Sequence, residues 1–246
     1  MGEIRVTFLG SGDAFSAKGG HQAAYLVDGD GSFLFDCGSS ALTAMKAYGI
    51  DAGRIDTVLI SHLHGDHFAG LPYLFLEYTY EQCRSRPLTI AGPPGTEERV
   101  RRLFAVVYKE LAARPSPYAL RFIELEPGTA TEIDGLHVDP FRVPHQEKEI
   151  SLGLVVTLEG RRIFYSGDTG WSEELVVRSQ GTDLFICECC YYETRVEYHL
   201  DYPRLRENRH RFGCKRMILT HLGREVHAHR EDVEIELAHD GLVVEL

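Results

Sequence analysis

The sequence predicts a mixed α+β fold in which helices cover a sandwich of β-sheets. Short β-branched or apolar runs, which indicate strands, alternate along the chain with segments of helical pattern. Some of the strand segments, such as 57–60, are apolar along their length, as expected when both faces of a strand are covered. No repeat, low-complexity tract or linker interrupts this alternation. We therefore expect a single domain over residues 1–246.

The individual elements follow from apolar periodicity and from Gly and Pro at their ends. In the first half we expect strands at 4–9, 23–27, 32–36, 57–60 and 88–91, and helices at 39–48, 68–80 and 97–112, the last capped by Thr96. In the second half we expect strands at 121–125, 131–133, 136–143, 152–158, 162–166, 184–187, 217–219 and 242–244, and helices at 173–179, 202–212 and 230–237.

Composition limits the partners that the chain can have. Its formal net charge of -11 opposes binding to nucleic acid and favours a small-molecule substrate. The first residues do not resemble a signal peptide, and no apolar run approaches the roughly 18 residues that span a membrane. The six cysteines include no C-x-x-C pair, which is typical of reduced thiols. We expect a cytoplasmic protein without membrane contact, and the sequence leaves a monomer and a homodimer open.

A dense group of candidate metal ligands follows the apolar segment 57–60. The run at 61–67 reads S-H-L-H-G-D-H and offers His62, His64, Asp66 and His67 within six positions. A loop at the end of a strand can direct side chains into a cleft, and Gly65 permits a tight backbone there. Imidazole and carboxylate groups are ligands for zinc, and also for manganese or iron. This spacing favours a metal site over a chance cluster of polar residues.

The H-x-H-x-D-H pattern resembles the signature of the metallo-β-lactamase superfamily. Three further candidates occur in the order that this superfamily shows, each after an apolar strand segment: His145, Asp168 and His221. The resemblance therefore covers nearly the whole chain. It implies a four-layer αββα metallo-β-lactamase sandwich that carries a two-metal hydrolase site.

The resemblance also implies how the ligands are shared. The seven positions form two groups of three and one bridging carboxylate: His62, His64 and His145; Asp66, His67 and His221; and Asp168. Two divalent ions, with zinc favoured over manganese or iron, would share a hydroxide that acts as nucleophile, and Asp66 would also orient it. Asp36, which follows the apolar residues 33–35 at the end of the strand segment 32–36, is either an acceptor for a ligand imidazole or a turn residue.

Three features favour the phosphodiester branch of the superfamily. The opening run V-T-F-L-G-S-G at 6–12 is similar to that of ribonuclease Z. Glu188 lies 20 residues after Asp168, where ribonuclease Z has a motif glutamate, and His199 lies 22 residues before His221, where it has a phosphate-contacting histidine. A carboxylate-held imidazolium suits phosphate charge and protonation of a leaving group. We take His199 and Glu188 as candidate catalytic residues, the alternatives being a surface histidine and a salt-bridged strand end.

Ribonuclease Z also has a long flexible arm that grips transfer RNA. Residues 118–143 contain only short strand and turn patterns, without a basic Gly/Pro-rich insertion. With the acidic net charge, this favours a phosphodiesterase for a small or cyclic phosphodiester and disfavours nucleic acid. Two alternatives stay open. One is a ribonuclease Z-like transfer-RNA 3′ endonuclease, and the other is a hydrolase of carboxylic esters, lactones or thioesters that uses the same dinuclear site.

Overall fold

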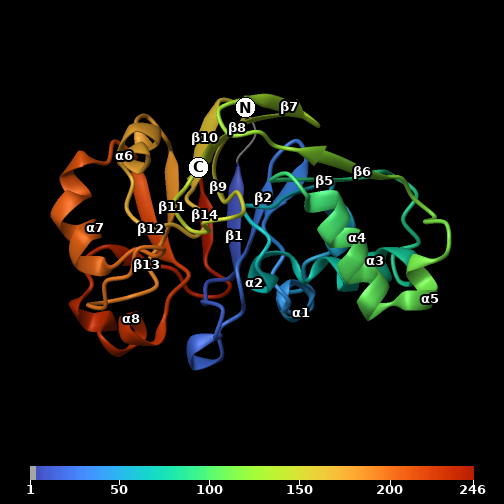
Figure 1. Cartoon of the computed structure of the whole chain (residues 1–246), viewed down its shortest axis with the longest axis horizontal. Coiled ribbons are helices and arrows are strands. Elements are labelled where there is room, and N and C mark those ends of the chain that lie inside the picture. Colours follow the sequence, from blue (N-terminus) through green and yellow to red (C-terminus); the bar gives the residue numbers. More distant parts are fainter. Residues whose placement is uncertain (1–3) are drawn as a thin grey trace.

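Two sheets lie face to face at the centre of the molecule (Figure 1). The computed structural model describes residues 4–246, and each sheet has seven strands. The first, in the spatial order β14-β1-β2-β3-β4-β5-β6, comprises Val243–Glu245, Arg5–Gly10, Ala24–Asp28, Ser32–Phe35, Thr57–Leu59, Leu88–Gly92 and Leu120–Glu124. The second, in the order β13-β12-β11-β10-β9-β8-β7, comprises Glu236–Leu237, Arg216–Thr220, Leu184–Glu188, Arg161–Tyr165, Leu152–Leu158, Leu136–Arg142 and Thr131–Ile133.

Helices cover the outer face of each sheet, so the molecule has the four layers αββα that the sequence predicts. The first sheet is covered by α1 (Ala41–Ala47), α3 (Leu71–Tyr80) and α4 (Thr96–Val107), with α2 (Gly65–Phe68) and α5 (Lys109–Ala112) beside them. The second is covered by α6 (Glu173–Ser179), α7 (Tyr202–Asn208) and α8 (Arg224–Ala228). Short 3₁₀ turns are η1 (Ala17–Gly19), η2 (Ala52–Arg54), η3 (Arg209–Arg211) and η4 (Arg230–Asp232).

The alternation of side chains along a strand explains why the strands are apolar on both faces. In β2, Tyr25 and Val27 pack into the core between the two sheets. Ala24 and Leu26 point the other way, into the core beneath α1 and α3. Successive side chains of a strand point to opposite faces, so a strand between two apolar layers has no polar face. The continuous apolar runs in the sequence therefore predicted the layered fold.

Several predicted helices differ from the observed ones; the helix expected at 202–212, for example, is divided into α7 and η3. Residues 230–237 form η4 and strand β13, and β13 is limited to residues 236–237, where it pairs in parallel with β12. The helix expected at 97–112 begins at Thr96, after Gly95 with a φ of 89°, and is divided at Tyr108 into α4 and α5. The helix expected at 68–80 begins instead at residue 71.

The interruption before α3 has a steric cause. A Cβ atom at Gly70 would lie 2.2 Å from the carbonyl oxygen of Gly38, so the backbone of Gly70 packs directly on the loop that follows β3. The Gly70 amide donates to the carbonyl oxygen of Cys37 in the same contact. This contact holds the α2 segment against the end of β3.

The strand order brings several loops to one end of the sandwich. Strands β3 to β6 are parallel, as are β10 to β13, and β8 runs in the same direction as β10 because both are antiparallel to β9. The loops that carry the candidate site residues follow the carboxyl ends of β3, β4, β8, β10, β11 and β12. No helix within residues 4–246 is long and apolar enough to cross a membrane.

Candidate functional site

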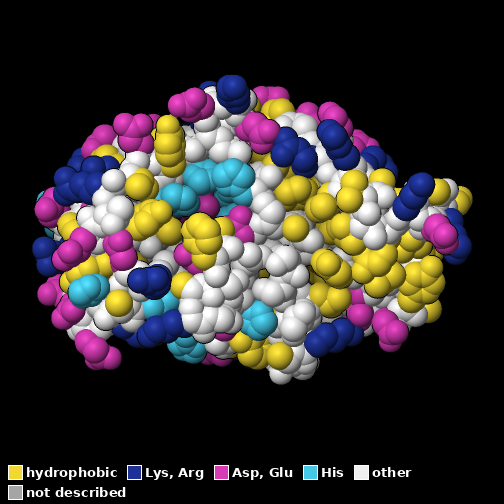
Figure 2. All heavy atoms as spheres, turned by 60° about the horizontal axis from the view of Figure 1, so that its bottom comes forward, with side chains coloured by type: hydrophobic (Ala, Val, Ile, Leu, Met, Phe, Trp, Pro, Cys, Tyr) yellow, Lys and Arg dark blue, Asp and Glu magenta, His cyan; other side chains and the backbone are white. Residues whose placement is uncertain are grey.

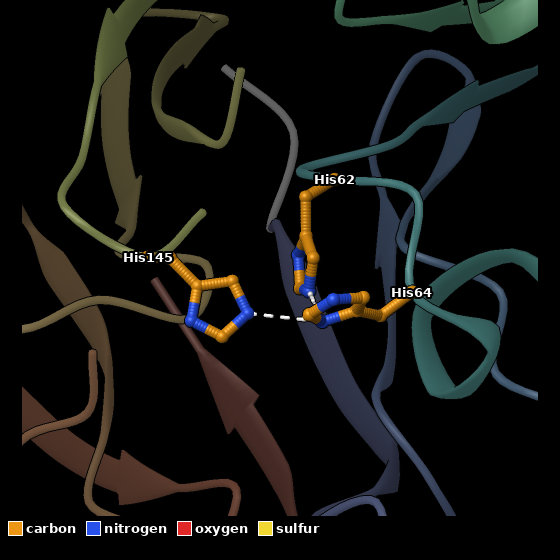
Figure 3. A group of neighbouring side chains, drawn as sticks. All are labelled: His62, His64 and His145. Carbon is orange, nitrogen blue, oxygen red and sulfur yellow. Dashed lines mark hydrogen bonds between the residues drawn. The ribbon is translucent and has the colours of Figure 1, made fainter. Parts of the chain in front are cut away.

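Three imidazoles converge from two loops at this end of the sandwich (Figure 3). His62 and His64 follow β4, and His145 follows β8. His64 Nδ1 lies 3.1 Å from His62 Nε2 and 3.0 Å from His145 Nε2. Nitrogens about 2.1 Å from one tetrahedral zinc ion would lie roughly 3.4 Å apart, so these three atoms have a spacing that suits one ion. We refer to these residues as the first ligand group.

A second group lies directly beside the first. Asp66, His67 and His221 face one another, with His67 Nε2 and His221 Nε2 at 3.2 and 3.3 Å from Asp66 Oδ2. Asp168 reaches both groups, because its Oδ2 lies 3.3 Å from His221 Nε2 and 3.7 Å from His62 Nε2. The carboxylate of Asp168 therefore lies between the two groups. Figure 2 shows histidine side chains gathered near the middle of this face, with acidic side chains beside them.

Two buried atoms of this cluster support its fit to metal ions. His67 Nε2 and Asp168 Oδ1 are buried and have no hydrogen-bond partner among the described residues. Buried polar atoms in proteins are almost always paired, so each unpaired one needs an explanation. Both atoms belong to the donor types that bind zinc, and both residues belong to one cluster of candidate ligands. The residues present therefore fit divalent metal ions.

The pKa values of the imidazoles separate the two groups. Burial lowers the pKa of His62 well below its ordinary value and also lowers the pKa of His145, so both are neutral and free to donate a lone pair. In the second group burial acts in the same direction, but the carboxylates of Asp168 and its neighbours outweigh it and raise the pKa of His67 and His221. The acidic second group therefore requires positive charge, which either protons or cations can supply.

Asp36 holds two of the candidate ligands in place. Its Oδ2 accepts a hydrogen bond from His67 Nδ1 at 2.7 Å, which leaves Nε2 of that ring facing Asp66 and Asp168. The same carboxylate accepts from the hydroxyl group of Ser61, and that hydroxyl oxygen lies 3.1 Å from His62 Nδ1. Asp36 is therefore the imidazole acceptor of the two alternatives considered from the sequence. Such outer contacts fix the tautomer and the orientation of a metal-binding imidazole.

The remaining imidazoles of the first group have different supports. His145 Nδ1 lies 2.9 Å from the carbonyl oxygen of Tyr198, an acceptor for its N–H group. His64 is exposed, and its Nε2 lies 3.0 Å from the side-chain nitrogen of Gln146. The other end of the Gln146 amide accepts from Ser151 Oγ. His64 is thus the one imidazole of the first group whose ring is held by an amide side chain.

An ion pair with a buried carboxylate lies beside both groups. Glu188, at the end of β11, is fully buried, and its Oε1 accepts from His199 Nδ1 at 2.9 Å and from the Thr169 amide at 2.6 Å. Its Oε2 accepts from two further backbone amides. Burial lowers the pKa of His199, but the Glu188 carboxylate outweighs this and raises it to about 9. His199 offers a ring nitrogen within 4.8 Å of ligand atoms of His145 and Asp168.

Comparison with known proteins connects this geometry with a family. The family model described as anti-Pycsar protein Apyc1 matches residues 4–243, almost the entire chain. The chain belongs to the Apyc1 family. A curated relative, ribonuclease Z of Agathobacter rectalis, is 30% identical to it over 242 residues, which cover 77% of this chain and 78% of that protein. These relations place this Apyc1-family chain in the metallo-β-lactamase superfamily, within the ribonuclease Z and phosphodiesterase branch.

Solved structures agree with the fold of the Apyc1-family chain. The metallo-β-lactamase fold protein YhfI from Bacillus subtilis superimposes with a TM-score of 0.80 at 23% identity, covering 99% of this chain and 100% of the other. The short form of human tRNase Z, ELAC1, gives a TM-score of 0.79 at 26% identity and covers 98% of both chains. The two-sheet architecture predicted from the sequence is therefore shared with both proteins.

The sequence identified the side chains of this cluster but missed several of their supports. All seven candidate ligands, with His199 and Glu188, lie in one region of the structure. The supporting roles of Ser61, Tyr165, Tyr198 and Gln146 had not been expected. Tyr165 donates to Asp36 from the opposite sheet at 2.7 Å, a contact between residues 129 positions apart. Ser61 and Gln146 are each adjacent in sequence to a candidate ligand, which is the signal that could have indicated them.

Proposed function

We propose that the chain is a dinuclear metal-dependent phosphodiesterase that acts on a small or cyclic phosphodiester. The observation that carries this proposal is the Glu188–His199 pair beside the two ligand groups. Hydrolysis of a phosphodiester needs a cation near the phosphate oxygens and a proton for the leaving oxygen. An imidazolium held by a buried carboxylate supplies both. Hydrolysis of a carboxylic ester or thioester involves no phosphate charge, so such an enzyme has less need of a further cationic group at this position.

Each residue's proposed role follows from its position in or beside the two ligand groups. Two divalent ions, with zinc as the first choice, would lower the pKa of a shared water into the neutral range. His62, His64 and His145 would hold one ion, and Asp66, His67 and His221 the other, with Asp168 between them. Asp66 would also accept a hydrogen bond from the attacking water and orient it. His199 Nδ1 donates to Glu188, so Nε2 is the atom left to donate a proton to the leaving oxygen.

Two features support a small substrate over transfer RNA. Residues 120–142, the region compared above with the RNA-gripping arm of ribonuclease Z, form β6, β7 and β8 with short connections. The chain also has a net charge of -11, which opposes a polyanion. The second candidate is a ribonuclease Z-like 3′ endonuclease, favoured by the 30% identity to a protein of that name.

A panel of substrates separates these candidates. Purified zinc-loaded protein is assayed with bis-p-nitrophenyl phosphate, cyclic nucleotides, a transfer-RNA precursor, a lactone and a thioester. The proposal expects the highest kcat/KM with a small or cyclic diester. Equal or higher efficiency with the precursor, cut at its 3′ end, would establish the endonuclease instead. Turnover confined to the lactone or the thioester would reject phosphodiester hydrolysis.

A further inference from the structure

A groove of about 340 Å³ adjoins the first ligand group. Its walls come from α4 and from the loop that follows β8, and they include Leu63, Glu98, Arg99, Arg102, Lys148 and Glu149. Leu63 lies in sequence between two candidate ligands, His62 and His64, so the groove begins at the loop that carries them. The loop that carries His62 and His64 therefore contributes both to the groove and to the first ligand group.

The loop on the other side of the groove is tied to the same ligand group. Gln146 precedes Lys148 by two residues and contacts His64 Nε2 at 3.0 Å. The Gln146 amide also accepts from Ser151 Oγ, beyond the end of the groove-lining segment 148–150. The segment that carries Lys148 is therefore anchored at both ends, and its position is set relative to His64.

The groove contains cationic groups without partners inside the protein. Arg99 forms an ion pair with Glu149 at 2.5 Å across the groove. The side chains of Arg102 and Lys148, by contrast, have no hydrogen bond or ion pair with any residue in the range 4–246. Glu98, one turn before Arg102 on α4, is likewise unpaired and offsets one of these charges. Three cations and two carboxylates thus line the groove, whereas the chain as a whole has a net charge of -11.

We propose that this groove binds a second phosphate group of the substrate, separate from the diester that is cleaved. Arg and Lys are the side chains that most often bind phosphate, and Arg102 and Lys148 approach from opposite walls. Glu98 keeps the surplus of positive charge small, which suits one phosphate group and not a long polyanion. The proposal rests on the proposed function, because it assumes that a phosphodiester occupies the metal cluster. It narrows the substrate class to diesters that carry a further phosphate.

Figure 2 shows Lys and Arg side chains on the same face of the molecule as the histidine group, with acidic side chains also present there. A diester at the cluster and a phosphate in the groove would then occupy neighbouring positions. Arg and Lys bind phosphate through charge-assisted hydrogen bonds, so removal of either cation should weaken binding by about tenfold.

Matched substrates test the groove during turnover. The dinucleotide dTpdT is compared with its 5′-phosphorylated and 3′-phosphorylated forms, for the wild type, Arg102→Ala, Lys148→Ala and the control Lys109→Ala, which removes a lysine of α5 outside the groove. We expect one phosphorylated form to have a KM about tenfold below that of dTpdT. Arg102→Ala and Lys148→Ala should abolish this advantage without changing kcat, and Lys109→Ala should preserve it. Equal KM values for the three dinucleotides in the wild type would overturn the proposal.

A binding measurement keeps this test independent of catalysis. Calorimetry of the zinc-loaded protein gives the Kd of thymidine 3′,5′-bisphosphate and of thymidine 5′-monophosphate. The bisphosphate should bind about tenfold more tightly, and Arg102→Ala should remove the difference. If the protein binds the bisphosphate in this way but cleaves no diester, the phosphate site in the groove is supported and the phosphodiesterase function is rejected. A difference that survives both groove substitutions would place the second phosphate elsewhere.

Discussion

His64 Nε2 and the side-chain nitrogen of Gln146 face each other at 3.0 Å on the outer side of the first ligand group. This contact requires His64 Nε2 to be the acceptor, with the ring proton on Nδ1. Binding a metal ion through Nδ1 moves that proton to Nε2, which then needs an acceptor. The Gln146 amide can provide one by turning over, so that its oxygen faces His64 and its nitrogen donates to Ser151 Oγ.

Gln146→Leu should therefore weaken metal binding at the first group by about tenfold or more, the usual scale for a lost outer contact of a ligand histidine. Gln146→Glu should bind metal at least as tightly as the wild type, because a carboxylate accepts from the His64 N–H without turning. Competition with a chromogenic chelator measures both affinities. An unchanged affinity in Gln146→Leu would show that the ring is oriented without this contact.

The two ligand groups predict close to two metal ions per chain. Asp168 Oδ2 is near histidines of both groups, so Asp168→Ala should lower the occupancy of both sites. By contrast, His145→Ala should lower occupancy chiefly at the first. Elemental analysis of protein purified without chelator and then loaded with zinc gives the stoichiometry. A ratio of one or less in the loaded wild type would contradict the dinuclear proposal.

His199→Ala should leave the metal content near normal and reduce phosphodiester turnover by about 100-fold or more, as expected for a positioned acid. The loss should be smaller for a p-nitrophenolate leaving group than for an alkoxide, because p-nitrophenolate departs without a proton. Steady-state kinetics with both kinds of diester provide the comparison. Wild-type rates in His199→Ala would remove the main support for phosphodiester hydrolysis and bring the ester-hydrolase alternative forward.

The pKa of about 9 at His199 predicts the alkaline side of the pH profile. Because the pKa is raised, the ring stays protonated through neutral pH and loses its proton as the pH rises through about 9. Turnover that depends on the imidazolium should fall over the same range. Glu188→Gln removes the charge that raises this pKa, so the decline should move to lower pH. A decline at the same pH in both proteins would assign it to another group.

The sequence predicted the parts of this molecule that depend on local pattern. Apolar runs and their spacing indicated the strands, and strand ends next to His or Asp indicated the ligands. The sequence could not predict the contacts that form only when the two sheets pack together. The hydroxyl group of Tyr165 reaches Asp36 from the other sheet, and no local pattern marks that tyrosine. The strand at 236–237 was missed for a related reason, since only its pairing with β12 reveals it.

The candidate ligands come from both halves of the chain, and this has a consequence for how the protein matures. During synthesis the segment with His62, His64, Asp66 and His67 emerges early, whereas His221 emerges only after nine-tenths of the 246 residues. A nascent chain therefore displays four ligand side chains with no completed partner group. An ion that binds only the folded chain stabilises the folded state by mass action. Metal bound after the chain is complete should therefore stabilise the packing of the two sheets. Incomplete chains would lack this stabilisation and should be more easily cleaved by proteases.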